Sequence, residues 1–272
     1  MTAVGTRRAD AIVVGAGIVG AACAVALARD GLRVLVLDAD RPALGTTAAG
    51  MGHLVVMDDS PEQLALTRYS VALWREQAEA VCAASELEWC GTIWVAEDAA
   101  QLDAVQAKRR LYAAQGIATE ILDEHTLYEA EPNLRRGLAG GLRVPSDGVI
   151  YPPAATVALL RVGRELVGWD PSINRRVLGK MIARATAFMP GLADLTAVRT
   201  WTGFRPATPD KLPLIGRWPE IPGLWIAAGH EGLGITTSLG TAAILADLVA
   251  GREPAIDAAP FAPDRGIPAE VH

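Results

Sequence analysis

Residues 11–38 read AIVVGAGIVGAACAVALARDGLRVLVLD, and their pattern is the most specific indication of the fold class. The apolar run at 11–14 predicts a buried strand, the alanine-rich run ending at Arg29 predicts a helix that stops at Gly31, and residues 32–37 predict a second strand. The pattern GxGxxG joins the first strand to the helix. Its glycines permit a tight turn, close approach of the backbone to a pyrophosphate and close packing of helix on strand. The helix N-terminus then presents free N–H groups to negative charge.

Asp38 closes the second predicted strand, where an acidic side chain can bond a ribose hydroxyl. A GxGxxG pattern alone is a weak indication, but strand, helix, second strand and terminal acid together predict a dinucleotide site. The residues expected to hold the dinucleotide here are Gly15, Gly17, Ile18, Gly20 and Asp38. This unit by itself does not separate NAD from FAD.

Composition excludes several other classes of function. The formal net charge is -6 and both signs are mixed along the chain, so we expect no nucleic-acid partner. The 3 cysteines include no CxxC pair, which predicts neither a disulfide framework nor a metal site and fits a reducing cytoplasm. Arginines at 7–8 before the apolar run 11–28 imitate a signal peptide, but glycines interrupt that run and a second apolar strand follows. We therefore expect neither a cleaved signal nor a transmembrane segment.

Two further glycine-rich segments lie far apart in the chain. Residues 44–53 read LGTTAAGMGH, which could let the backbone wrap around a bulky planar ligand or could be a flexible linker. Residues 203–216 read GFRPATPDKLPLIG and precede a predicted strand at 224–228. Residues 229–237, GHEGLGITT, then open a helix predicted to run to about Ala250. This second strand-to-helix turn again aims backbone donors at an electron-rich group.

Together these segments resemble the D-amino-acid oxidase (DAO) superfamily, which includes glycine oxidase, sarcosine oxidase and the flavin subunits of D-hydroxyproline dehydrogenase and hydrogen cyanide synthase. The run MGHLVVMDDS at 51–60, with Tyr69, Trp74 and CGTIW at 90–94, is most similar to the D-hydroxyproline dehydrogenase branch. The resemblance implies an α/β fold, with an FAD-binding Rossmann-like domain of the DAO type and an interleaved, truncated α+β substrate domain. We expect residues 1–90 and 205–258 to form the FAD-binding domain, 91–204 the truncated substrate or cap region, and 259–272 a loose tail.

The same resemblance implies roles for individual residues. The loop after Asp38 would line the flavin, and the second turn would donate to its pyrimidine edge. The residues concerned are Gly45, Thr46, Thr47, Gly50, Gly52, Gly232, Leu233, Gly234, Ile235 and Thr236. Thr47 stands where some relatives carry a histidine bonded to FAD, and no cysteine follows Cys90, so non-covalent FAD is expected.

Three side chains are candidates for the catalytic site. Arg205 matches the arginine that grips the substrate carboxylate in glycine oxidase, and a guanidinium is suited to that task by its bidentate geometry. His230 adjoins the second turn, where a positioning role is favoured over acid–base chemistry. His53 could face the flavin or only pack in its loop.

The expected function is FAD-dependent oxidation of the C–N bond of a small amino or imino acid, such as D-proline, hydroxyproline, glycine or sarcosine, by hydride transfer. The electron acceptor stays open between oxygen, a quinone and an electron-accepting partner subunit. The alternative is a non-catalytic or impaired deletion form, acting at most as a fold remnant or complex subunit. It rests on the junction Leu160-Arg161, where the resembled family continues into a strand ending in an Asn-Ala-Ala-Gly type turn that this chain lacks.

Between residues 61 and 203, the periodicity of apolar residues and the positions of glycine and proline predict further helices and strands. They are an amphipathic helix at 61–82, a strand at 91–96, helices at 98–115 and 123–131, a strand at 161–169, a basic helix at 174–188 and a strand at 198–203.

Overall fold

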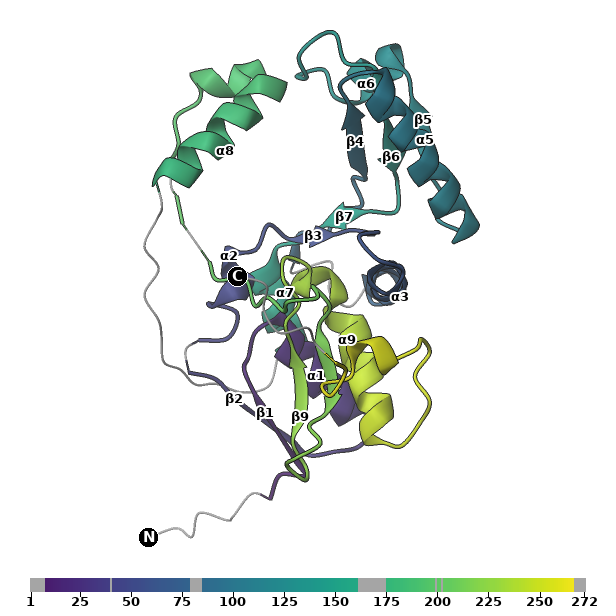
Figure 1. Ribbon diagram of the computed structural model, residues 1–272. Helices are drawn as coiled ribbons and strands as arrows, with labels where there is room; N and C mark the ends of the chain where they lie inside the picture. Colours follow the sequence, from purple (N-terminus) through teal and green to yellow (C-terminus); the bar gives the residue numbers. More distant parts are fainter. Residues whose placement is uncertain are drawn as a thin grey trace. The chain divides into compact units, whose positions relative to one another are not determined.

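The computed structural model describes residues 8–39, 41–78, 85–160, 175–198, 200–201 and 203–266. They fall into two compact units (Figure 1). The first comprises Met1–Glu88, Val149–Trp169 and Gly203–His272, and the second comprises Trp89–Gly148 and Asp170–Thr202. The chain therefore crosses from the second unit back to the first within β7 (Gly148–Val149), so the described residues 149–160, which the sequence pattern placed with the cap, belong to the first unit.

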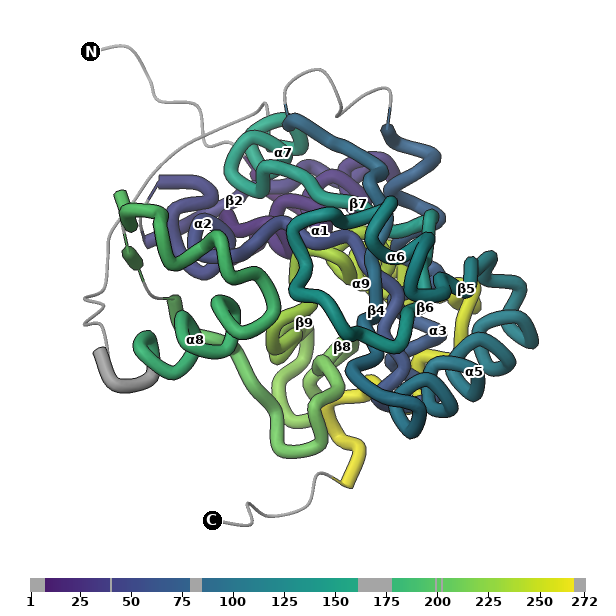
Figure 2. Tube along the Cα trace, turned by 90° about the horizontal axis from the view of Figure 1, so that it is seen from above, coloured from purple at the N-terminus to yellow at the C-terminus, as the bar shows by residue number. Residues whose placement is uncertain are grey.

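The first unit begins with the predicted strand–helix–strand motif. β1 (Ala11–Val14) pairs in parallel with β2 (Val34–Leu37), and α1 (Ile18–Arg29) connects them. The alanine-rich α1 lies along α9 (Gly234–Val249), as both views show (Figures 1 and 2). Small side chains on α1 allow this close packing, and the pair forms the centre of the unit.

Three further helices and a short strand also belong to the first unit. α3 (Pro61–Glu76) begins at Ser60, whose hydroxyl accepts from the Gln63 N–H at 3.1 Å, and packs on α9. α7 (Pro152–Leu160) packs on α1. α2 (Thr46–Ala49) and β3 (His53–Leu54) follow the β2 strand.

The strands of the first unit form small separate sheets. β8 (Leu214–Arg217) and β9 (Trp225–Ala228) make an antiparallel pair, and among the described residues they do not pair with β1 or β2. One face of β1 is open: Ile12 is 59% and Val14 84% exposed. Ile12 and Val14 alternate along the strand with the less exposed Ala11 and Val13, so both faces of β1 are apolar. This is the usual pattern of a strand with another layer beside each face.

The second unit is built on a three-stranded antiparallel sheet. Its order is β4 (Thr92–Ala96), β6 (Gly140–Val144) and β5 (Glu120–Leu122). Helices α5 (Ala99–Ala114) and α6 (Glu124–Ala130) are each capped at their N-terminus by an aspartate, Asp98 and Asp123. The remaining elements are α8 (Arg175–Phe188) and η1 (Pro190–Asp194).

Several expected elements differ from the structure. The helix expected at 61–82 ends at Glu76 in α3, and the described residues of 198–203 are not in a strand, because Val198 is exposed and unpaired there. The strand expected at 161–169 lies outside the described residues. Strands β5, β6 and β8 were not expected, since glycines and prolines in or beside β6 and β8 hide the alternation of a strand.

The C-terminal tail, expected to be loose, is packed over its described part. η2 (Ala259–Phe261) places the Phe261 ring in the core at 1% exposure, and Arg265 pairs with Asp210 at 2.7 Å. The buried Phe261 side chain, together with the ion pair and hydrogen bonds of Arg265, therefore holds a segment whose proline and alanine content predicts disorder. Among the helices described, none is both long and apolar enough to span a membrane.

Candidate functional site

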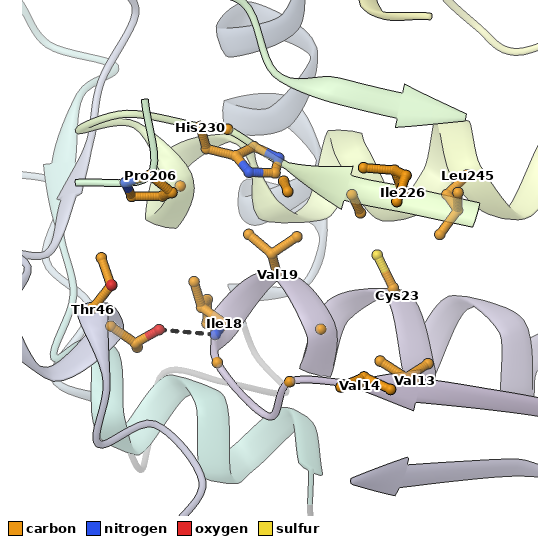
Figure 3. A pocket seen from close by; sticks show the side chains of 18 of the residues that line it. Val13, Val14, Ile18, Val19, Cys23, Thr46, Pro206, Ile226, His230 and Leu245 are labelled. Carbon is orange, nitrogen blue, oxygen red and sulfur yellow. Dashed lines mark hydrogen bonds between the residues drawn. The ribbon is translucent and has the colours of Figure 1, made fainter. Parts of the chain in front are cut away.

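A cavity of about 1150 Å³ lies within the first unit. It is bordered by the glycine turn and first turns of α1, the α2 loop, the segment 203–206, and the turn that leads from β9 into α9. Figure 3 shows Thr46, Pro206 and His230 at one end of it, and Cys23, Ile226 and Leu245 at the other. Its volume is at the upper limit of ordinary small-molecule pockets, roughly 300–1,000 Å³, which suits a long ligand.

The glycine turn has the geometry that its motif predicts. Gly15 has φ +108°, which only glycine adopts easily, and a Cβ added there would meet no other atom within 4 Å. A Cβ at Gly20 would collide with the Gly15 carbonyl oxygen, so α1 can approach β1 only with glycine at that position. The turn thus leaves open space over Gly15 and closes the gap between helix and strand at Gly20.

The N-terminus of α1 is capped from another loop. The Ile18 N–H donates to Oγ1 of Thr47 at 3.0 Å, drawn as the dashed line in Figure 3. The N-cap residue Gly17 has no side chain to do this, and a Cβ on it would lie 3.0 Å from the same hydroxyl. Thr47 therefore joins α2 to the positive end of α1 and satisfies one of its free N–H groups.

Asp38 contacts the glycine turn from its other side. Its carboxylate accepts a hydrogen bond from the Ala16 N–H in a very short contact. Asp38 does not border the cavity, although a ribose-binding role was expected for it. This bond holds Asp38 beside the turn that carries Gly15 and Gly17, and its bond to a ribose hydroxyl stays a prediction.

Arg205 borders the cavity in an irregular segment that is held on both sides. The Phe204 carbonyl accepts from the Thr46 hydroxyl at 3.0 Å, and the Pro206 carbonyl accepts from the Glu231 N–H at 2.9 Å. A Cβ on Gly232 would lie 3.2 Å from the guanidinium carbon, so the side chain lies against the second glycine turn. Arg205 makes no ion pair or hydrogen bond with any other residue that the structure describes, which leaves its charge free for a ligand.

His230 borders the cavity but its ring is buried, at 5% exposure. Nε2 lies 3.0 Å from Oγ1 of Thr241 on α9. Burial lowers the pKa of His230 to about 4, so the ring is neutral near pH 7. A neutral, hydrogen-bonded ring positions the turn and is a poor proton donor at that pH.

His53 is exposed and its side chain does not border the cavity. Its main-chain carbonyl instead accepts from Oγ1 of Thr236 at 2.8 Å. The Trp74 indole Nε1 donates to the carbonyls of Ile235 and Thr236 at 3.3 and 3.1 Å. Thr236 therefore joins β3 to the start of α9 through its side chain, and it does not border the cavity.

The structure gathers most of the predicted site residues around one cavity. Those that border it are Gly15, Gly17, Ile18, Gly20, Thr46, Thr47, Gly50, Arg205, His230, Gly232, Gly234 and Ile235. Those that do not are Asp38, Gly45, Gly52, Leu233, Thr236 and His53.

The far end of the cavity was missed in the sequence. It lies between β1 and β9, and Figure 3 shows Val19 and Cys23 of α1 directed toward the side where Ile226 and Leu245 lie. Burial raises the pKa of the Cys23 thiol to about 12, so the thiol is protonated. These side chains have only the apolar periodicity of a core, so no local signal distinguishes them from packed residues.

Comparison with known proteins agrees with this geometry. The family model described as "DAO: FAD dependent oxidoreductase" matches residues 10–168 and 159–248. The chain is 40% identical over 96 residues to glycine oxidase of Pseudomonas aeruginosa, covering 35% of this chain and 26% of that protein. It is 38% identical over 133 residues to D-amino acid dehydrogenase 2 of Ralstonia nicotianae, covering 43% and 31%. The aligned stretches thus span less than a third of each of these curated relatives.

Solved structures share the fold over nearly the whole chain. Glycine oxidase from Geobacillus kaustophilus has a TM-score of 0.85 at 22% identity, covering 97% of this chain and 100% of that one. L-proline dehydrogenase from P. horikoshii has a TM-score of 0.82 at 17% identity, covering 91% and 95%. The mixed α/β fold is therefore of the DAO type, and the chain belongs to the DAO family of FAD-dependent oxidoreductases.

Proposed function

We propose that this protein oxidises the C–N bond of a small amino or imino acid, with FAD as the cofactor and Arg205 as the anchor of the substrate carboxylate. The observation that carries the proposal is the guanidinium of Arg205, which borders the cavity beside Gly232 and has no partner among the described residues. A guanidinium in that situation is suited to a carboxylate, which it can bind through two parallel hydrogen bonds. D-Proline, D-hydroxyproline, glycine and sarcosine all carry this group.

The residues around the cavity fit FAD. Gly15 leaves open space where a Cβ would stand, next to the N-terminus of α1, and Gly17 and Gly20 also border the cavity. This is the arrangement that binds a pyrophosphate through backbone N–H groups and the helix dipole. Thr46, Gly50, Gly232 and Gly234 would border the flavin end. When bound, FAD supplies the hydride acceptor.

The chain's own residues would bind and orient the substrate. Arg205 holds the carboxylate, and the hydrogen bonds on Phe204 and Pro206 fix the direction from which it does so. His230, neutral and bonded to Thr241, keeps the 229–232 turn in place without adding a charge beside the flavin end. No general base is needed among these residues if the substrate binds with a neutral amine.

Non-covalent attachment of FAD forms part of the proposal. The hydroxyl of Thr47, at the position where some relatives carry a linking histidine, bonds the Ile18 N–H and offers no atom for such a link. A cytoplasmic location and an electron-accepting partner subunit are proposed with it. The free thiols of Cys23 and Cys90 suit a reducing compartment.

The test is reconstitution with FAD followed by a visible spectrum and a dye-reduction assay. A flavin spectrum that survives gel filtration, together with dye reduction by D-hydroxyproline, D-proline, glycine or sarcosine, is expected. Matched assays with D-prolinamide, which lacks the carboxylate, should give much slower reduction. Equal rates with the amide would contradict the role of Arg205, and a protein that keeps no flavin would contradict the proposed cofactor.

A second candidate is an impaired form of such an enzyme that needs a partner chain. The small separate sheets of the first unit favour it. Among the described residues, β1 pairs only with β2 and β9 only with β8; both strands border the same cavity, and Val14 is 84% exposed. The two stretches of the family match overlap at 159–168, at the predicted junction after Leu160. Unpaired backbone groups at two strand edges destabilise a domain whose total stability is only about 5–15 kcal/mol.

Calorimetry with FAD separates the two candidates. The impaired form predicts FAD binding weaker than micromolar, and no turnover of D-hydroxyproline, in spite of intact glycine motifs. Sub-micromolar binding with steady turnover would show that the chain works without a partner.

A further inference from the structure

Arg265 stands at the centre of a hydrogen-bonded cluster in the first unit, far along the chain from the cavity residues. Its Nε and Nη2 donate to the two carboxylate oxygens of Asp210 at 2.7 and 3.0 Å. Nη2 also donates to the Leu212 carbonyl at 2.6 Å, and Nη1 to the carbonyls of Pro213 and Ala262 at 3.0 and 3.2 Å. A guanidinium has five N–H donors. All of them are therefore used, and the side chain is only 12% exposed.

These bonds hold a segment that has no regular secondary structure between residues 203 and 213. Within it, the Lys211 N–H donates to the Thr208 carbonyl at 3.1 Å and the Thr208 hydroxyl to the Leu212 carbonyl at 2.8 Å. Lys211 has φ +61°, a left-handed conformation that a lysine adopts only when its surroundings enforce it. Asp210 accepts from the Leu212 N–H at 3.2 Å, and the Arg265 bonds lower the pKa of its carboxyl, so the pair stays charged near neutral pH.

The cluster connects to Arg205 through a stiff stretch of chain. Pro206 and Pro209 restrict the backbone between Arg205 and Asp210. The first of these prolines is joined to the 229–232 turn by the Glu231 N–H at 2.9 Å. A shift of the Asp210 turn would therefore also shift Arg205, because the two proline rings fix two of the backbone φ angles between these residues.

We propose that Arg265 is a positioning residue for substrate binding: through Asp210 and the carbonyls of Leu212 and Pro213, it sets the place of Arg205 at the cavity. This inference rests on the proposed function, in which Arg205 binds a carboxylate. It also gives the packed C-terminal segment a role, since Phe261 in the core and the Ala262 carbonyl hold Arg265 in place.

The variants are Arg265→Gln, Arg265→Lys and Asp210→Asn, with Arg252→Gln as the matched control. Arg252, like Arg265, forms a charged cluster, in its case with two aspartates, Asp30 and Asp247, both at 2.7 Å. It is however 49% exposed and, among the described residues, bonds none of 203–213. It therefore reports what the loss of a double ion pair does to the protein in general. Arg265→Lys keeps the charge with three donors instead of five and should restore part of the effect.

Two measurements are made on each variant. Hydrogen exchange of peptides covering 203–213 and 229–233 needs no ligand. Binding of cyclopentanecarboxylate, a non-oxidisable shape analogue of proline, is titrated on the FAD-loaded protein beside its neutral amide. We expect Arg265→Gln and Asp210→Asn to speed exchange in 203–213 and to weaken carboxylate binding about ten-fold, with little change for the amide. Arg252→Gln should change neither.

Each outcome is decisive. Faster exchange with unchanged carboxylate affinity, or equal effects of Arg252→Gln, would overturn the positioning role in favour of general stabilisation. Unchanged exchange in Arg265→Gln would overturn it outright. If the wild-type protein binds the carboxylate no better than the amide, the proposed role of Arg205 fails, whereas the exchange data still decide whether Arg265 orders the segment.

Discussion

The Thr46 side-chain hydroxyl donates a hydrogen bond to the main-chain carbonyl of Phe204 at 3.0 Å, across 158 positions of sequence. Thr46 belongs to the loop expected to line the flavin, and Phe204 immediately precedes the proposed substrate anchor. The bond means that the cofactor loop and the anchor segment share a contact before any ligand binds. Binding at one of them is therefore expected to depend on the order of the other.

Thr46→Val removes this hydroxyl while keeping the shape of the side chain. We expect the carboxylate affinity of the FAD-loaded protein to fall about five-fold, the equivalent of about 1 kcal/mol for one hydrogen bond. Thr46→Ser keeps the donor and should retain the wild-type affinity. Titration with cyclopentanecarboxylate measures both, and equal affinities for all three proteins would show that the contact does not influence the anchor.

Gly17→Val should abolish detectable FAD binding. Its Cβ would lie 3.0 Å from the Thr47 hydroxyl and would fill the space where the backbone meets a pyrophosphate. Gly179→Ala on α8 is a control, because no other atom lies within 4 Å of its added Cβ. Absorbance at the flavin band after gel filtration decides the result; FAD retained by Gly17→Val would count against the assignment of this turn.

Arg205→Met keeps the length of the side chain and removes its charge. Losing a charge-assisted clamp should weaken binding of carboxylate substrates by roughly 2 to 4 kcal/mol in apparent affinity. FAD binding should change little, because the backbone N–H groups at the α1 N-terminus that are proposed to bind the pyrophosphate are unchanged. The Michaelis constant for D-hydroxyproline is compared with the dissociation constant of FAD. A Michaelis constant equal to that of the wild type would exclude Arg205 as the anchor.

His230 should make the stability of the protein depend on pH between about 6.5 and 4. Above this window the ring is neutral in both states. As the pH falls through this window, the imidazole is protonated in the unfolded chain but stays neutral in the folded protein. The free energy of unfolding therefore decreases by up to about 3 kcal/mol. Below this window the ring is protonated in both states, and it lowers the free energy of unfolding no further.

Urea unfolding of wild type and His230→Gln at pH 7.5, 5.5 and 4.5 measures this effect. The glutamine variant should lack the decrease between pH 7.5 and 4.5, because an amide does not titrate there. Carboxyl groups with a lowered pKa, such as that of Asp210, lose their contribution to the free energy of unfolding only at a lower pH, below this window. A parallel pH dependence in both proteins would show that His230 is not its source.

Much of the fold follows from local sequence. The strand–helix–strand unit at 11–37 was predicted because its apolar runs, its glycines and the stop at Gly31 all act over a few neighbouring residues. The DAO family, the mixed α/β fold and the glycine turns and Arg205 that border the cavity were also predicted, since the glycine segments carry specific motifs. The site roles given to individual residues stay predictions until the variants are measured.

Other features depend on residues brought together from distant parts of the chain. Thr47 on the α1 N-terminus, Thr46 on Phe204, and Arg265 on Asp210 are side-chain contacts with no periodicity, so no local pattern predicts them. Tertiary structure also decided that His53 does not border the cavity and that the described part of the tail is packed through Phe261. From the residues alone, the glycine turns were predicted to bind phosphate and Arg205 to bind a carboxylate, because backbone conformation and charge are local properties. Only the tertiary structure decided which hydrogen bonds hold those segments in place, because each bond needs a partner whose position depends on the packing of the whole unit.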